Sequence, residues 1–256
     1  MRALKDTIRS WLRPLGIEVT SAKALTRLSE AAYDLEVLRT LPAEHAPQLL
    51  KLLPKSRSQR RQDLFVLSEL DFKRNGFFVE FGAADGVYLS NTYVLEKEFG
   101  WTGILAEPAK AYHRALSENR AAHIEYDCVW ENTGSTLSFK EPERPHLSTI
   151  EAYSGSDHHR DLRKRGKTYD VRTISLLDLL KKHEAPKDID YLSIDTEGSE
   201  FDILNSFDFG AYSFRVITCE HNRTQMREKL FTLLSSGGYR RKYENLSAFE
   251  DWYVRS

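Results

Sequence analysis

From residue 77 onward, short apolar runs alternate with segments of helical periodicity, and this alternation restricts the fold more than any other feature. Strands are predicted at 77–82, 102–106 and 123–130, with helices near 90–99 and 109–119 between them. An apolar run closed by glycines is typical of a strand covered on both faces. Strands separated by helices form βαβ units, so the sequence predicts an α/β fold with a mostly parallel sheet.

The alternation resumes later in the chain and changes near its end. A helix is predicted near 175–183, and strands at 191–194 and 214–219. Two further strands are predicted at 239–243 and 249–254. Too few residues separate these last two strands for a crossover helix, so we expect them to be antiparallel.

Two stretches fall outside this pattern. Residues 1–57 show helical periodicity without recognisable chemistry, and we expect a helical N-terminal region before a domain at 58–256. Between 141 and 167, prolines, glycines and serines predict a long loop. The loop contains His146 and the basic residues Arg160, Arg163, Lys164, Arg165 and Lys167. Two explanations stay open: a solvated, mobile insertion, and a lid whose cations receive an acidic acceptor.

The composition argues against several kinds of partner and location. With 37 Lys and Arg against 38 Asp and Glu, we expect no general affinity for nucleic acid. Cys128 and Cys219 are too few for a disulfide framework, which is typical of a reducing compartment. The apolar runs are far shorter than a membrane span and the start lacks a secretory signal, so we expect a cytoplasmic protein.

One face of the predicted N-terminal helix is apolar and is surrounded by basic residues. The face consists of Leu4, Ile8, Trp11 and Leu12. Such a helix can dock on its own domain, pair with a second subunit in a homo-oligomer, or contact a membrane surface peripherally.

Acidic residues follow several predicted strands at the point where the chain leaves the sheet. Ligands of open α/β sheets bind outside these carboxyl ends, near the point where the strand order reverses. Glu107 ends the second strand, 25 residues after Gly82. A carboxylate at this place can accept hydrogen bonds from both hydroxyls of a ribose.

The turn after the first strand argues against a dinucleotide. The dinucleotide pattern would require glycines where Ala84 and Val87 stand. Glu80 and Asp85 would also repel a pyrophosphate. The turn suits a cationic ligand, and S-adenosylmethionine carries a ribose, a sulfonium and an α-amino group.

Several ordered motifs over residues 58–254 resemble the FkbM-type methyltransferases. They are Glu80–Gly86, Ser90–Thr92, Gly100–Pro108, Asp195–Glu200, Glu220–Asn222 and Asp251–Tyr253, with Gln59, Gln62 and Asp63 upstream. The resemblance implies a class I methyltransferase fold, Rossmann-like, with a seven-stranded sheet and helices on both faces. It also implies transfer of a methyl group from S-adenosylmethionine, usually to a hydroxyl of a sugar or natural product.

The resemblance also implies a cofactor site. Four residues would lie along the methionine part: Glu80, Gly82, Asp85 and Gly86. Asn91 would lie close by, and Glu107 would hold the ribose. Asp127 and Cys128 would lie at the edge of the adenine. The wider class often has glycine where this chain has Ala84.

The two later strand ends carry the candidates for catalysis. Methyl transfer to an alcohol requires an in-line approach and removal of the hydroxyl proton, for which Asp195, Glu197, Glu220 and His221 are candidates. His221 has the unperturbed pKa best suited to a base, and the alternative is that it only bonds neighbouring carboxylates. Asp195, Glu220 and Asn222 could instead converge on magnesium or manganese, similar to the catechol O-methyltransferase type.

The leading hypothesis is therefore an S-adenosylmethionine-dependent O-methyltransferase whose partner is a small-molecule or glycan acceptor. Its expected target is a hydroxyl of a sugar, a glycoconjugate or a related natural product. One alternative is an N- or carboxyl-methyltransferase acting on another small molecule. The other is a non-catalytic module that binds a glycan or a partner with the same fold.

Overall fold

The chain forms two units in the computed structural model, Met1–Ala46 and Pro47–Ser256. Leu4 and Ile8 of the predicted apolar face lie outside the described residues, as do His158 and His159 of the predicted loop. The structure describes residues 11–12, 14, 16, 20–155 and 160–256.

The first unit contains the helix α2, Ala22–Thr40, and the short 3₁₀ helix η2, Ala43–His45. Ser21 caps α2, because its hydroxyl accepts a hydrogen bond of 3.1 Å from the backbone N–H of Ala24. Among the described residues, no helix is both long and apolar enough to cross a membrane.

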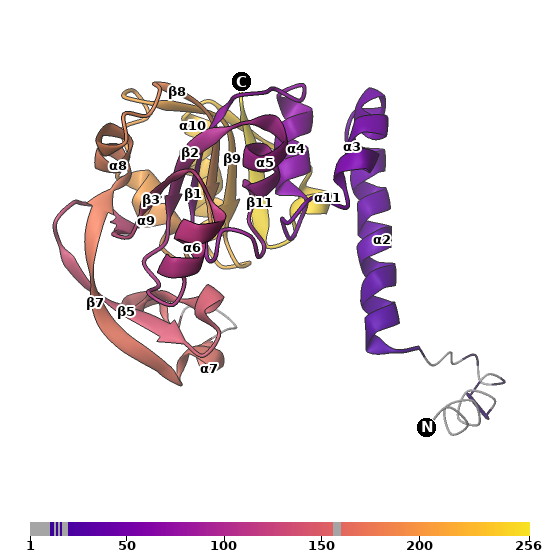
Figure 1. The fold of residues 1–256 in the computed structure, drawn as a ribbon, viewed down its shortest axis with the longest axis horizontal. Coiled ribbons are helices and arrows are strands. Elements are labelled where there is room, and N and C mark those ends of the chain that lie inside the picture. Colours follow the sequence, from indigo (N-terminus) through magenta and orange to yellow (C-terminus); the bar gives the residue numbers. More distant parts are fainter. Residues whose placement is uncertain (1–10, 13, 15, 17–19, 156–159) are drawn as a thin grey trace. The chain divides into compact units, whose positions relative to one another are not determined.

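The second unit is built on a seven-stranded sheet in the order β10-β11-β9-β8-β1-β2-β3 (Figure 1). β1 pairs in parallel with both β2 and β8, whereas β11 pairs antiparallel with β9 and β10. The mostly parallel α/β sheet and its antiparallel end are confirmed. The strand order reverses at β1, where ligands of such sheets bind. The strands are β1 Phe77–Phe81, β2 Thr102–Ala106, β3 His123–Glu125, β8 Asp188–Ile194, β9 Ser213–Glu220, β10 Tyr239–Lys242 and β11 Glu250–Arg255.

Helices cover both faces of this sheet. Val79 and Phe81 of β1 pack in one core with leucines of α8, α9 and α10. Phe78 faces the other side, where the guanidinium of Arg120 lies 5.5 Å from its ring centroid. On that side Phe65 of α4 also stacks on Trp252 of β11. The helices are α3 Ala46–Leu52, α4 Gln62–Glu69, α5 Tyr93–Phe99, α6 His113–Asn119, α8 Leu176–Lys182, α9 Glu200–Asn205, α10 Met226–Ser236 and α11 Glu244–Ser247.

The long loop predicted at 141–167 is wrong in part, because a second sheet enters it from both ends. This sheet has four strands in the order β4-β7-β5-β6, and β5 pairs antiparallel with β7. The strand predicted at 123–130 is likewise divided, and its second half belongs to this sheet. The added elements are β4 Cys128–Trp130, β5 Thr136–Pro142, β6 Thr149–Ile150 and β7 Gly166–Ser175, with the short helices η3 Pro145–Leu147, η4 Glu151–Tyr153 and α7 Arg160–Arg163.

Candidate active site

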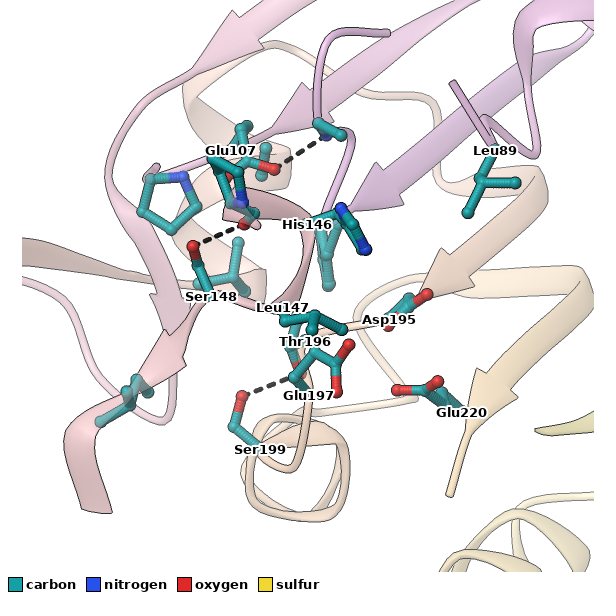
Figure 2. A pocket seen from close by; sticks show the side chains of 18 of the residues that line it. Leu89, Glu107, His146, Leu147, Ser148, Asp195, Thr196, Glu197, Ser199 and Glu220 are labelled. Carbon is teal, nitrogen blue, oxygen red and sulfur yellow. Dashed lines mark hydrogen bonds between the residues drawn. The ribbon is translucent and has the colours of Figure 1, made fainter. Parts of the chain in front are cut away.

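A cavity of about 680 Å³ opens at the carboxyl ends of β1, β2, β8 and β9 (Figure 2). The second sheet contributes Phe139 and Ile150 to its wall. Its size is typical of sites for cofactors and small molecules. Acidic side chains reach it from three strand ends, as the sequence predicts: Glu107, Asp195, Glu197 and Glu220.

Gly82 lines the cavity and allows two strand ends to meet. Its φ is +74°, and a Cβ atom there would lie 1.9 Å from the carbonyl oxygen of Asp195. Because that oxygen belongs to the backbone, no side chain can be accommodated at this position. Gly82 therefore brings the end of β1 directly against the end of β8.

Glu107 lies beside this junction at the end of β2. Its two carboxylate oxygens accept hydrogen bonds of 2.8 Å from the backbone N–H groups of Ala84 and Ala109. Ala84 has a left-handed φ of +48°, which turns its N–H toward the carboxylate. Burial raises the pKa of Glu107 to about 7. Cys128 also lines the cavity, as predicted for the adenine side.

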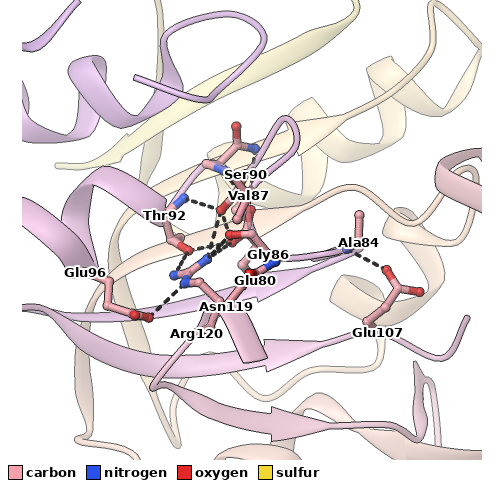
Figure 3. A network of polar contacts seen from close by, with 12 residues as sticks. Glu80, Ala84, Gly86, Val87, Ser90, Thr92, Glu96, Glu107, Asn119 and Arg120 are labelled. Atoms are coloured by element: carbon pink, nitrogen blue, oxygen red, sulfur yellow. Dashed lines mark hydrogen bonds and ion pairs between the residues drawn. The ribbon is translucent and has the colours of Figure 1, made fainter. Parts of the chain in front are cut away.

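Glu80 is not among the residues that line the cavity, so its predicted place along the methionine part of the cofactor stays a prediction. It is buried in a polar network on the other face of β1 (Figure 3). Its carboxylate accepts from the N–H of Asn91 at 2.7 Å and from the hydroxyl of Thr92, and Arg120 lies 3.9 Å away. Burial raises the pKa of Glu80, against the opposing charge of Arg120. Glu80 therefore holds the segment that leads into α5.

Asp85 and Gly86 also serve the local fold and are not part of the cavity lining. The Asp85 carboxylate accepts from the N–H groups of Val87 and Tyr88 at 2.9 and 2.7 Å and so closes the turn. A Cβ atom on Gly86 would lie 2.5 Å from Cγ of Arg120. Gly86 therefore makes room for Arg120, and its place beside the cofactor stays a prediction.

Two further residues predicted near the cofactor lie outside the cavity lining, Asn91 and Asp127. The amide nitrogen of Asn91 donates to the Ser193 hydroxyl at 2.9 Å, and its buried oxygen has no hydrogen-bond partner among the described residues. The N–H of Asp127 donates to Glu125 at 3.1 Å. Of the predicted cofactor residues, the cavity brings together Gly82, Glu107 and Cys128.

The acids at the later strand ends form a cluster. Ligand atoms of Asp195, Glu197 and Glu220 all lie within 4.8 Å of one another. Burial raises the pKa of both Asp195 and Glu220, and the neighbouring acids raise that of Glu220 further. We refer to these three residues as the acid cluster.

Asn222 lines the cavity beside the acid cluster, but its contacts differ from those of a metal ligand. Its amide nitrogen donates to Glu220 at 2.9 Å and to Glu197 at 3.3 Å. Glu197 joins Asp195 and Glu220 in the acid cluster, and Asn222 as a metal ligand stays a prediction. An acidic cluster of this kind has the oxygen donors that hard divalent cations prefer.

His221 is not among the residues that line the cavity, which does not favour its prediction as the base. Its Nδ1 accepts a hydrogen bond of 3.0 Å from the N–H of Arg223, and its Nε2 lies 3.8 Å from Asp251. The side chain is 1% exposed. The alternative reading, a histidine placed against a neighbouring carboxylate, describes it better.

His146 of η3 is the imidazole that lines the cavity, and the sequence reasoning did not select it as a base. It extends into the cavity on the side of Asp195 (Figure 2). Burial lowers the pKa of His146, so the ring is neutral and able to accept a proton near pH 7. Its place within the stretch predicted as a loop concealed its position at the cavity.

The basic run of the predicted loop does not supply the cavity with cations. Arg163 is buried against Glu197, and Lys164 pairs with Asp161 at 2.7 Å. Among the lining residues of the described chain, the one arginine or lysine is Arg223.

Comparison with known proteins identifies the family. Residues 80–241 match the sequence family described as methyltransferase FkbM domain. No curated protein matches the chain. Similar solved structures include a precorrin-6y C5,15-methyltransferase from Geobacter metallireducens, at 11% identity and a TM-score of 0.39, over 75% of this chain and 85% of that one. Another is an S-adenosylmethionine-dependent methyltransferase from Aquifex aeolicus, at 11% identity and a TM-score of 0.38, over 78% of this chain and 95% of that one. This chain belongs to the FkbM family of S-adenosylmethionine-dependent methyltransferases.

Proposed function

We propose that this methyltransferase transfers the methyl group to a hydroxyl of a sugar, a glycoconjugate or a related natural product. The observation that supports this most strongly is one shared cavity. Glu107, suited to the ribose of the cofactor, opens into the same space as the acid cluster. Carboxylates beside the acceptor accept hydrogen bonds from hydroxyls and orient them.

The residues present fit S-adenosylmethionine. The oxygens of Glu107 keep further lone pairs for the ribose hydroxyls after accepting from two backbone N–H groups. Gly82 would lie beside the methionine part and Cys128 beside the adenine. When bound, the cofactor supplies a methyl group activated by its sulfonium.

The chain's own side chains then orient the acceptor and remove its proton. We assign the base to His146, whose neutral imidazole takes the hydroxyl proton as the carbon–oxygen bond forms. Burial and Arg144 lower the pKa of His146, and the charge of Asp195 opposes this shift and so favours the imidazolium that results. Asp195 and Glu197 keep the predicted place at the site, in the role of orienting groups.

We also propose that the acid cluster binds a divalent cation, magnesium or manganese. The support is the approach of ligand atoms of three carboxylates to within 4.8 Å of one another, and the raised pKa of Glu220, to which the like charges of its neighbours contribute. A cation there would lower the pKa of an acceptor hydroxyl. Activity that survives thorough chelation, and that neither ion increases, would contradict this part of the proposal.

The experiment that tests the function is a methyl-transfer assay over three sets of acceptors. The sets carry hydroxyls, amines and carboxylates, and mass spectrometry locates the added methyl group. We expect product from hydroxyl acceptors of the carbohydrate type. Transfer to amines or carboxylates would favour the N- or carboxyl-methyltransferase. Cofactor binding without transfer to any set would favour the non-catalytic module.

A further inference from the structure

Arg163 is one of the largest fully buried side chains of the described structure, although it belongs to the basic run predicted at the surface. It ends the short helix α7, between β6 and β7. A buried guanidinium requires a carboxylate and further hydrogen-bond acceptors around it. Its partners therefore indicate its role.

Two contacts of Arg163 join the wall of the cavity to the acid cluster. Its Nη2 lies 2.7 Å from a carboxylate oxygen of Glu197. Its Nε donates a hydrogen bond of 2.7 Å to the backbone carbonyl of Leu147, the residue after His146. Figure 2 shows Leu147 next to Glu197, with His146 above them in the view. One side chain thus connects the segment that carries the imidazole with the end of β8.

A second contact strengthens this connection. The hydroxyl of Thr149 donates to the backbone carbonyl of Glu197 at 3.0 Å. Glu197 itself has a left-handed φ of +59°, a conformation that costs free energy for a residue with a side chain. Arg163 and Thr149 together hold Glu197 in it.

Within the described part of the chain, the next two residues after Arg163 make no such contacts with the cavity wall or the acid cluster. Lys164 forms an ion pair with Asp161 in which both side chains are about 70% exposed, 73% and 69%. Arg165 is exposed. These two residues therefore provide matched controls of the same charge, one and two positions away.

We propose that Arg163 is a positioning residue for methyl transfer, which fixes His146 relative to the acid cluster and does not bind the acceptor. The proposal rests on the proposed function, because His146 is the base there. Its physical basis is that a small displacement of a catalytic group, about 1 Å, lowers a rate by on the order of 10²-fold.

The kinetic test compares Arg163→Met with Lys164→Met and Arg165→Met. We expect Arg163→Met to lower kcat by about 10²-fold, with the Kd for S-adenosylmethionine and the KM for the acceptor within about threefold of the parent. The two controls should retain full kcat. A raised KM for an acidic acceptor with unchanged kcat would overturn the proposal in favour of acceptor binding.

A second readout does not depend on activity. In protein labelled with ¹⁵N-histidine, the imidazole signals of His146, assigned with His146→Gln, should shift in Arg163→Met and stay in place in Lys164→Met. If Arg163→Met does not fold, Arg163→Lys is used for the same measurement, because lysine keeps the positive charge but lacks the planar guanidinium with its several N–H donors. Unchanged His146 signals in a folded Arg163 variant would refute the positioning role. Shifted signals without hydroxyl methylation would refute only the proposed function.

Discussion

The role of Glu107 can be tested with the substitution Glu107→Gln. Glutamine keeps the size of the side chain but replaces one carboxylate oxygen by an NH2 group. Both oxygens of Glu107 accept hydrogen bonds of 2.8 Å from backbone N–H groups, so the NH2 group would face a donor. At least one charge-assisted hydrogen bond to the ribose is then lost. Such a bond contributes about 1.5–3 kcal/mol, so we expect the Kd for S-adenosylmethionine to rise roughly 10- to 150-fold.

The pH dependence of binding gives this prediction a sharper form. Because the pKa of Glu107 is raised to about 7, the carboxyl is largely ionised at pH 8 and largely protonated at pH 6. If the ionised form binds the ribose, the affinity should fall by about tenfold from pH 8 to pH 6. Glu107→Gln should remove most of that dependence.

Isothermal titration with S-adenosylmethionine and with its demethylated product, at pH 6, 7 and 8, measures both effects. The matched control is Glu118→Gln, an exposed acid outside the cavity lining whose carboxylate pairs with Arg114. Unchanged affinity in Glu107→Gln, or the same pH dependence with and without the carboxyl, would refute the assignment of Glu107 to the ribose.

Three further predictions follow from the same contacts. Burial and neighbouring acids raise the pKa of Glu220 in the folded state, so the contribution of this group to stability is greatest at low pH and is lost as the pH rises through the folded pKa. Glu220→Gln should therefore raise Tm at pH 8 by about 2–4 °C per kcal/mol relieved, and a melt without such a gain would show that the acid cluster is not strained. His146→Gln should lower kcat by about 10²–10⁴-fold. His221→Gln should lower Tm and change kcat by less than about tenfold. The reverse pattern would identify His221 as the base. Gly82→Ala should prevent folding, because its Cβ atom would lie 1.9 Å from a backbone oxygen. The control is Gly134→Ala, where φ is +88° and a Cβ atom would have no neighbour within 4 Å. In a denaturant titration this control should lower the free energy of unfolding by only about 1–2 kcal/mol.

The part of the fold that the sequence predicts is the part with strong periodicity. The strands of the main sheet are buried on both faces, so their apolar runs are distinct. The second sheet gives a weaker signal. In β7 most of the residues from Gly166 to Asp170 are exposed, and a strand of this kind shows polar residues without a clear alternation.

The position of a residue at a strand end is predictable, whereas the direction of its side chain depends on distant residues. Glu107 and Asp195 point into the cavity as predicted. Glu80 instead faces Arg120, which lies forty residues later and enters through the space left by Gly86. Such long-range packing cannot be deduced from spacing within one motif.

At the end of β9, too, the sequence places the residues but does not by itself give the direction of each side chain. His221 follows Glu220 directly, and two successive residues of an extended chain point in opposite directions. Glu220 therefore turns toward the cavity and His221 toward Asp251. The period of two is visible in the sequence, and it indicates that both side chains cannot serve the same site. His146 and Arg163 could not be found in this way, because the fold of their segment was not predicted.

The central claim is that one cavity holds the ribose at Glu107 and the reacting oxygen at the acid cluster. A crystal structure of the protein with demethylated cofactor and manganese tests it most directly. We predict the ribose hydroxyls on the Glu107 carboxylate and an anomalous manganese peak between Asp195 and Glu220. Cofactor bound elsewhere, or turned so that its sulfur lies far from the acid cluster, would contradict the account.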